Sequence, residues 1–556
     1  MTLLRTSLAG LLSVGVVAGS VAAAPTSLAA NTPTAAAVPT ASINAGLKPC
    51  AKYPDLKGKK PGRLLRYREV PVDPTLLTGA RMFRVMFTTT GLDERHVQAA
   101  CGLVVIPTKG LTNEVVAWSH GTVGVHQSCQ PSNNPVKFLS GGAIKYGSVN
   151  GTTQNGIWQG LVDQGRLITA TDYYSAAGRR ATKQQNYVAG VPAGAAVLDS
   201  VRTGIQLVKK VRDQQRKKWK LGIWGASQGG AAALWAGQLA NRYLVGTARP
   251  GQPPIKLMGV LANVPASSFV ATHKSPRSLL GRHLGDMEMH TAMTEIAGKP
   301  VGSAGPILFS LVMSSWHKYA DSGQPSRNAL FPGYPRGVRP DLPAVLTSEG
   351  IGTANVVEES CVSESALIPL LAATQKYLDN PADNPFFIPT IWGKENKSGQ
   401  FQGRLDRTCR KPSTAAGIKK WCTWLAYNMP GPDGINPFPK LPHKADGSPA
   451  PVMIAEGMDD TLIYCQNDSP TVPAARDCMA RQLYDSMATK RTCKATSVTL
   501  NLFAKTATSP ASHLSTTFQL ADNGNAEYRG SPMDRFLNKS FSNKIRPGCA
   551  AQILNK

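Results

Sequence analysis

The chain has 556 residues, and its Lys and Arg outnumber Asp and Glu by 61 to 34, which gives a formal net charge of +27. The positive charge is spread along the chain and no basic helix interleaved with aromatic residues is visible, which argues against nucleic-acid binding. After the first residues no apolar run is long enough to span a bilayer.

The N-terminal residues predict a secretory signal and a linker. Residues 1–24 contain Arg5 and then an apolar run that ends in small residues, the pattern of a cleaved signal peptide. Residues 25–47 are rich in Ala, Thr, Pro and Ser, which offer too little apolar surface to order a chain. We therefore expect a secreted, extracellular protein.

The cysteines fit an oxidising compartment. There are 10 of them, an even number, and none lies in a CxxC pair, so we expect up to five disulfide bonds and no zinc site. Their pairing does not follow from the sequence. Cys465, Cys478 and Cys493 are close enough along the chain for a local bridge.

Apolar runs alternate with helical patterns after the linker, which is typical of strands joined by crossover helices. The helical patterns include residues 155–165 and 193–215. The first two predicted strands are candidates for an antiparallel pair. The runs that predict strands are residues 81–90, 101–107, 114–119, 166–172, 220–224, 255–264, 451–457 and 496–504. Their apolar character on both faces predicts an α/β fold with a mostly parallel sheet covered by helices.

The connection between the sixth and seventh predicted strands is far longer than a crossover requires. We expect a large, largely helical cap or lid, residues 266–430, inserted there. The core is then split into residues 48–265 and 431–556.

Ser227 is the predicted nucleophile. It lies in "GASQG", residues 225–229, which matches the G-x-S-x-G turn between a strand and a helix. An apolar run precedes the motif and the helical pattern "QGGAAALWAGQLANRY" follows it. Glycine fits residues 225 and 229 because a side chain at either position would collide with a neighbouring strand or helix.

A serine nucleophile needs a base and an acid, which in this kind of fold follow it in the order acid, histidine. His513, the last of 9 histidines, follows the final predicted strand and is the candidate base. The acid should follow the preceding strand, where Asp459 and Asp460 come just after Gly457. We favour Asp460; Glu456 is a poorer choice because it falls within the predicted strand.

Acyl transfer also requires donors directed at the developing oxyanion. One is the backbone N–H of Gln228, the residue after the nucleophile. The other should come from the loop after the third predicted strand, where His120, Gly121 and Thr122 follow directly. His120 also competes as a base, but it precedes Ser227 and lies at a strand end, where an oxyanion role fits better.

These residues resemble a known family. "AWSHGTVG", "TDYYSAAG", "YVAGVPAGAAVLDSVR", "GASQGG", "IAEGMDDTLI" and "SHLST", in this order, are similar to the secretory lipase family that includes Candida antarctica lipase A. The resemblance implies an α/β-hydrolase core, a helical cap after the sixth strand, and hydrolysis of carboxylic esters such as acylglycerols. It carries over Ser227, Asp460 and His513 as the catalytic triad, with Gln228 and Thr122 as oxyanion donors.

Other functions remain open. An acyltransferase would use the same triad with an alcohol or sugar acceptor, and a peptidase would more often bring an additional domain that is not visible here. A non-catalytic protein could bind anionic lipid or envelope surfaces through the net charge. "HLGDMEMH", residues 283–290, contains metal-ligand residue types, but we expect a polar face of a cap helix there, and neither metal nor cofactor.

Overall fold

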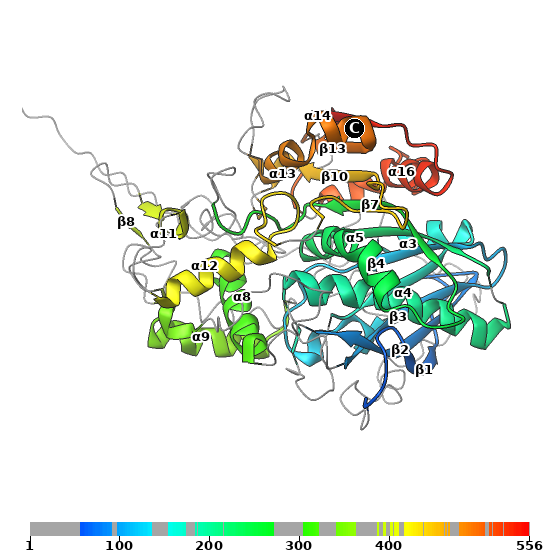
Figure 1. Cartoon of the computed structure of the whole chain (residues 1–556), viewed down its shortest axis with the longest axis horizontal. Helices are drawn as coiled ribbons and strands as arrows, with labels where there is room; N and C mark the ends of the chain where they lie inside the picture. Colours follow the sequence, from blue (N-terminus) through cyan, green and yellow to red (C-terminus); the bar gives the residue numbers. More distant parts are fainter. Residues whose placement is uncertain are drawn as a thin grey trace, which may run out of the picture.

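The computed structural model of the chain contains one large mixed β-sheet (Figure 1). It describes residues 56–91, 97–135, 154–173, 184–185, 187–214, 216–271, 304–321, 341–362, 386–387, 393–395, 401–403, 405–410, 416–436, 439–460, 462–463, 465–466, 478–505, 511–513, 515–525 and 527–554. The predicted signal peptide, the linker and the "HLGDMEMH" segment lie outside these residues. No helix in the described ranges is long and apolar enough to cross a membrane.

The sheet has ten strands in the order β1-β2-β3-β5-β4-β6-β7-β10-β13-β14. Strand β2 pairs antiparallel with β1 and β3, and β3 with β5, whereas all later neighbours are parallel. The strands are β1 (Leu64–Val70), β2 (Ala80–Thr90), β3 (Val97–Pro107), β4 (Glu114–Ser119), β5 (Leu167–Thr171), β6 (Trp219–Ala226), β7 (Ile255–Asn263), β10 (Val452–Gly457), β13 (Ser497–Phe503) and β14 (Gly548–Leu554). The predicted α/β fold and the antiparallel early pair, β2 with β3, are confirmed.

Two strands of the large sheet were not predicted from the sequence. Strand β1 precedes the first predicted strand, so β7, after which the cap was expected, is the seventh strand and not the sixth. Strand β14 adds the other edge of the sheet. Both are edge strands that are largely accessible to solvent, so neither carries the continuous apolar run that identifies the central strands.

Helices cover both faces of the sheet. Helices α4 (Gly190–Arg212) and α5 (Gln228–Gly246) pack together on one face. Helices α3 (Gln154–Asp163) and α16 (Pro532–Phe541) contribute to the apolar core on the other face. Near the C-terminus lie α13 (Met479–Met487), α14 (Lys490–Ala495) and α15 (Ser515–Leu520). Burial on both faces explains why adjacent residues of β4 and β5, such as Val115 and Val116 or Leu167 and Ile168, are apolar.

Between β7 and β10 the described residues are mostly helical. They form α8 (Ala304–Asp321), α9 (Ser348–Glu359), α11 (Leu405–Arg410), α12 (Ala416–Asn428) and a short hairpin of β8 (Gly393–Glu395) and β9 (Phe401–Gly403). Figure 1 shows α8, α9 and α12 grouped at one side of the sheet, away from α16. The expected cap boundaries, 266 and 430, stay a prediction.

Disulfide bonds join four pairs of described cysteines: Cys129–Cys361, Cys409–Cys422, Cys465–Cys478 and Cys493–Cys549. The Cys465–Cys478 bond is one of the local bridges that the spacing allowed. The Cys129–Cys361 bond is different, because it connects the segment after β4 to the segment after α9.

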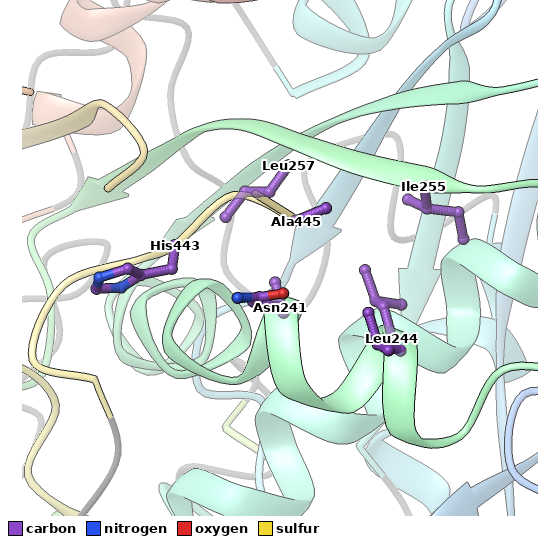
Figure 2. A pocket seen from close by; sticks show the side chains of 8 residues that line it. Asn241, Leu244, Ile255, Leu257, His443 and Ala445 are labelled. Atoms are coloured by element: carbon purple, nitrogen blue, oxygen red, sulfur yellow. The ribbon is translucent and has the colours of Figure 1, made fainter. Parts of the chain in front are cut away.

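A small pocket lies at the C-terminal end of α5, between that helix, β7 and the segment around His443 (Figure 2). Its lining includes Leu244 and Leu257. Its volume of about 20 Å³ has room for little more than one water molecule. Ser227 is at the opposite end of α5, so this pocket does not bind the substrate of the candidate site.

Candidate active site

Ser227 lies on the turn between β6 and α5 in a conformation that non-glycine residues rarely adopt. Its φ is 58° and its ψ is −121°, and its N–H donates to Asn263 O at 3.0 Å. The flanking glycines make the turn sterically feasible. A Cβ on Gly225 would lie 2.1 Å from Gly229 O, and one on Gly229 would lie 1.9 Å from Ser119 O. The backbone is therefore strained at Ser227, as expected for a nucleophile turn.

Asp460 and His513 form a hydrogen-bonded pair. His513 Nδ1 and Asp460 Oδ2 are 2.7 Å apart, and the Asp460 side chain is fully buried. Asp460 Oδ1 accepts the backbone N–H groups of Leu462 and Ile463 at 2.7 and 2.9 Å. Burial alone would raise the pKa of Asp460, but His513 and the accepted hydrogen bonds outweigh it and lower the pKa. Asp460 is therefore an ionised carboxylate, and of the two aspartates it is the one bound to His513.

Glu456 lies beside Asp460 and is fully buried at the end of β10. Its side chain is hydrogen-bonded to that of Asp460, and burial together with the Asp460 charge raises its pKa well above the usual range. Two carboxylates cannot share a hydrogen bond without a proton, because an ionised carboxylate only accepts. Glu456 is therefore the neutral member of the pair and donates to Asp460.

His120 is not arranged as a base. Its side chain is buried, its Nδ1 lies 2.7 Å from Gly121 O, and its ring packs on Tyr173 with the centroids 4.6 Å apart. Burial lowers the pKa of His120 to about 4, so the imidazole is neutral at ordinary pH. The next residue, Gly121, passes close to the nucleophile, since a Cβ built on it would lie 3.7 Å from Ser227 Cβ.

Two backbone N–H groups in the segments that border Ser227 have no hydrogen-bond partner among the described residues. Gln228 is the first residue of α5, where the N–H groups have no partner within the helix. Within the described residues the Thr122 N–H also has no hydrogen-bond partner. Thr122 Oγ1 lies 2.8 Å from Tyr187 OH. Both residues predicted as oxyanion donors thus belong to the segments that border Ser227.

The strand order explains how these residues meet. Strands β4, β6, β7, β10 and β13 are parallel neighbours. The segments that follow them therefore lie together where the carboxyl-terminal ends of these strands meet, which is the sheet edge meant below. Asp460 and His513 are in direct contact there. No hydrogen bond joins Ser227 to His513 among the described residues, which is common where no substrate aligns the two groups.

Sequence reasoning missed one residue at this edge, Tyr187, whose hydroxyl contacts Thr122. The only signal was its place in "YVAGVPAG", one of the segments that resemble the secretory lipases. Glu456 was considered only as a poorer candidate for the acid, because it falls within the predicted strand.

The sheet order, with Ser227 after β6, Asp460 after β10 and His513 after β13, is that of the α/β-hydrolase fold. Residues 151–275 match the model of the family described as "Secretory lipase". The resemblance to secretory lipases is thus confirmed over that segment, which includes Ser227. No curated protein sequence matches the chain.

Solved structures share the fold over most of the chain. Candida antarctica lipase A in its closed state is 15% identical with a TM-score of 0.53, covering 91% of this chain and 87% of that one. A mutant of the rice cell wall degrading esterase LipA from Xanthomonas oryzae is 14% identical with a TM-score of 0.51, covering 87% and 99%. At such low identity the two structures establish the fold alone.

Proposed function

We propose that the protein is a secreted carboxylic ester hydrolase that acts through an acyl-enzyme intermediate. The observation that carries the proposal is the Asp460–His513 pair on the same sheet edge as the strained Ser227. The similarity of residues 151–275 to secretory lipases supports an ester substrate and export.

In the acylation step, Ser227 Oγ attacks the ester carbonyl carbon and His513 Nε2 takes the hydroxyl proton. Asp460 keeps the other ring nitrogen, Nδ1, protonated and stabilises the imidazolium that forms. The negative charge on the carbonyl oxygen is bound by N–H groups of Gln228 and Thr122. The N-terminal end of α5 adds a favourable dipole at that position.

The tetrahedral intermediate collapses when His513 returns the proton to the departing alcohol oxygen. Water then attacks the acyl-enzyme by the same steps in reverse, with His513 as the base, and releases the carboxylic acid. An alcohol or sugar in place of water would give acyl transfer by the same residues. Product analysis of one ester with and without an added alcohol separates the two reactions.

Ser227→Ala tests the proposal directly. We expect kcat for p-nitrophenyl esters to fall by a factor of about 10⁴ or more, because the nucleophile is removed. The matched control is Ser542→Ala, which changes an exposed serine at the end of α16 and should leave kcat unchanged. Unchanged turnover in a folded Ser227→Ala protein would overturn the proposal.

The acyl group that the site prefers is best tested with p-nitrophenyl esters from acetate to palmitate. A protein that acts on lipids should retain kcat/KM on the long chains, whereas a preference confined to acetate would define an esterase for small substrates. The Ser227→Ala variant provides the blank for each ester, so that only hydrolysis that requires Ser227 is compared between chain lengths.

A further inference from the structure

The loop that follows β4, residues 120–126, is held by two segments that are distant in the sequence. On one side Gln185 N donates to Val125 O at 2.9 Å. On the other, Val362 N donates to Val123 O at 3.0 Å. The main chain of this loop, called the β4 loop below, is therefore fixed by the residues before α4 and by those after α9.

A covalent bond reinforces the contact with the end of α9. Cys129, just beyond the β4 loop, is disulfide-bonded to Cys361. The two segments also touch closely at Gly124, where a Cβ would lie 2.7 Å from Ser360 O. Gly124 has a φ of +102°, so no other residue type would be accommodated without strain.

Tyr187 connects the β4 loop to the core beneath it through Thr122. The Tyr187 phenol is buried, burial raises its pKa, and within the described residues Thr122 Oγ1, at 2.8 Å, is its only hydrogen-bond partner. A buried O–H that does not donate is costly, so Tyr187 donates and Thr122 accepts. The Thr122 hydroxyl proton then remains available, and the rotation of the side chain is fixed.

The backbone of Tyr187 is held in turn by α8. Ser315 Oγ accepts the Tyr187 N–H at 2.9 Å, and Trp316 Nε1 donates to Tyr187 O at 2.5 Å. Both side chains are almost fully buried. Ser314, also on α8, donates to Glu358 of α9 at 2.7 Å, so the two helices that support the β4 loop are also joined to each other.

We propose that Tyr187 is a positioning residue of the oxyanion hole, and that α8 and α9 form a fixed support that holds Thr122 beside Ser227. This inference rests on the proposed ester hydrolysis. It assigns to the described helices between β7 and β10 a part in stabilising the transition state, in addition to any part in binding the acyl chain. Opening of the site for substrate must then occur elsewhere than at α8 and at the end of α9.

A double-mutant cycle with Tyr187→Phe and Thr122→Val tests the first half of the inference. We expect kcat for p-nitrophenyl butyrate to fall at least tenfold in Tyr187→Phe, with KM changed by less than about twofold, because oxyanion contacts form mainly in the transition state. Thr122→Val should lose as much or more. The double variant should be no worse than Thr122→Val alone, because Tyr187 acts through Thr122.

Tyr243→Phe is the matched control. It also removes a buried phenol hydroxyl, one that contacts Thr90 and Asp199 far from the β4 loop. We expect a lower Tm but an unchanged kcat per active site, counted with a phosphonate that labels Ser227. Additive losses in the Tyr187 and Thr122 cycle, or an unchanged kcat in Tyr187→Phe, would overturn the inference.

The second half of the inference is tested by removing disulfides. The pair Cys129→Ser and Cys361→Ser should lower kcat at least tenfold at unchanged KM, because the β4 loop loses its covalent support. The pair Cys409→Ser and Cys422→Ser removes a bond between α11 and α12 and should leave kcat unchanged. Equal kcat in the two double variants would refute the support role. The proposed function would instead be refuted if Ser227→Ala, as the only substitution, left kcat unchanged.

Discussion

The Asp460 side chain has a second acid, Glu456, beside it. Glu456, which stays protonated, adds a hydrogen bond to a carboxylate that already accepts from His513 and from two backbone N–H groups. Such a bond fixes the orientation of Asp460 without adding charge. Ionisation of Glu456 would place a second negative charge in the same buried space, which is why its pKa is raised.

This arrangement predicts opposite outcomes for two substitutions at Glu456. Glu456→Gln retains a donor toward Asp460, so kcat at neutral pH should stay within about threefold of wild type. Glu456→Leu has no donor, and kcat should fall at least tenfold, because a hydrogen bond to a charged group is worth about 1.5–3 kcal/mol. Steady-state kinetics of both purified variants checks the prediction, and equal kcat values would contradict it.

The same pair predicts a pH effect on stability. Glu456 has a higher pKa folded than unfolded, so its contribution to stability is complete below the unfolded value of 4.5 and is lost as the pH rises toward the folded one. Glu456→Gln does not titrate. The wild type should therefore lose stability relative to Glu456→Gln as the pH rises above 4.5, as measured by urea unfolding at several pH values.

Sequence position was sufficient to predict that Asp460 and His513 lie on neighbouring loops, because the order of strands fixes which loops meet at the sheet edge. It was not sufficient for Tyr187. That residue precedes α4, and only folding places its hydroxyl against Thr122 and its backbone against α8. The position of Tyr187 depends on α8, a segment distant in the sequence, so no local sequence pattern predicts its contact with Thr122.

At the level of secondary structure, α9 contains two glycines with contrasting surroundings. A Cβ on Gly350 would lie 2.0 Å from Phe386 O, whereas one on Gly352 would meet no atom within 4 Å. The first glycine allows the backbone of residue 386 to approach the helix. The second has no such packing role and only lowers helix propensity.

Substitution of each glycine by alanine should therefore change stability in opposite directions. Gly350→Ala should destabilise the protein by about 1–3 kcal/mol, because the clash is with backbone and cannot be relieved by a side-chain rotation. Gly352→Ala should stabilise it by about 1 kcal/mol or slightly less. Thermal unfolding of both variants gives the comparison, and a Tm shift of the same sign in both would contradict the packing described for α9.

The central strands could be predicted because they are buried on both faces and read as continuous apolar runs. The edge strands could not. In β1, four consecutive residues from Arg66 to Glu69 are exposed. Backbone pairing with β2, and not burial of its side chains, makes this segment a strand. Strand β14, which pairs with β13 alone, was missed for the same reason. Because β1 was missed, the strand before the inserted helices was counted as the sixth and not the seventh.

For the molecule as a whole, the net charge of +27 is the dominant long-range property. This positive charge would attract the protein to an anionic lipid surface and so bring it close to any substrate in that surface. Charge of this kind acts over about 10 Å at 0.1 M salt and less at higher concentrations.

We expect the protein to sediment with phosphatidylglycerol vesicles at low ionic strength and to be released at about 0.5 M NaCl, where charges are screened within a few ångströms. Vesicles of phosphatidylcholine are the control and should bind little at either concentration. Binding that is equal for the two lipids, or that does not change with salt, would show that apolar contacts and not charge bring the protein to a membrane.

The position of β10 in the sheet has a consequence for how the chain folds. β7 is complete by residue 263, but its partner β10 begins only at residue 452. During synthesis the hydrogen-bonding edge of β7 is therefore exposed while almost two hundred residues are added. An exposed parallel edge is a template for association with other chains. Aggregation during production is thus expected to begin at β7, and conditions that slow this aggregation should raise the yield of folded protein.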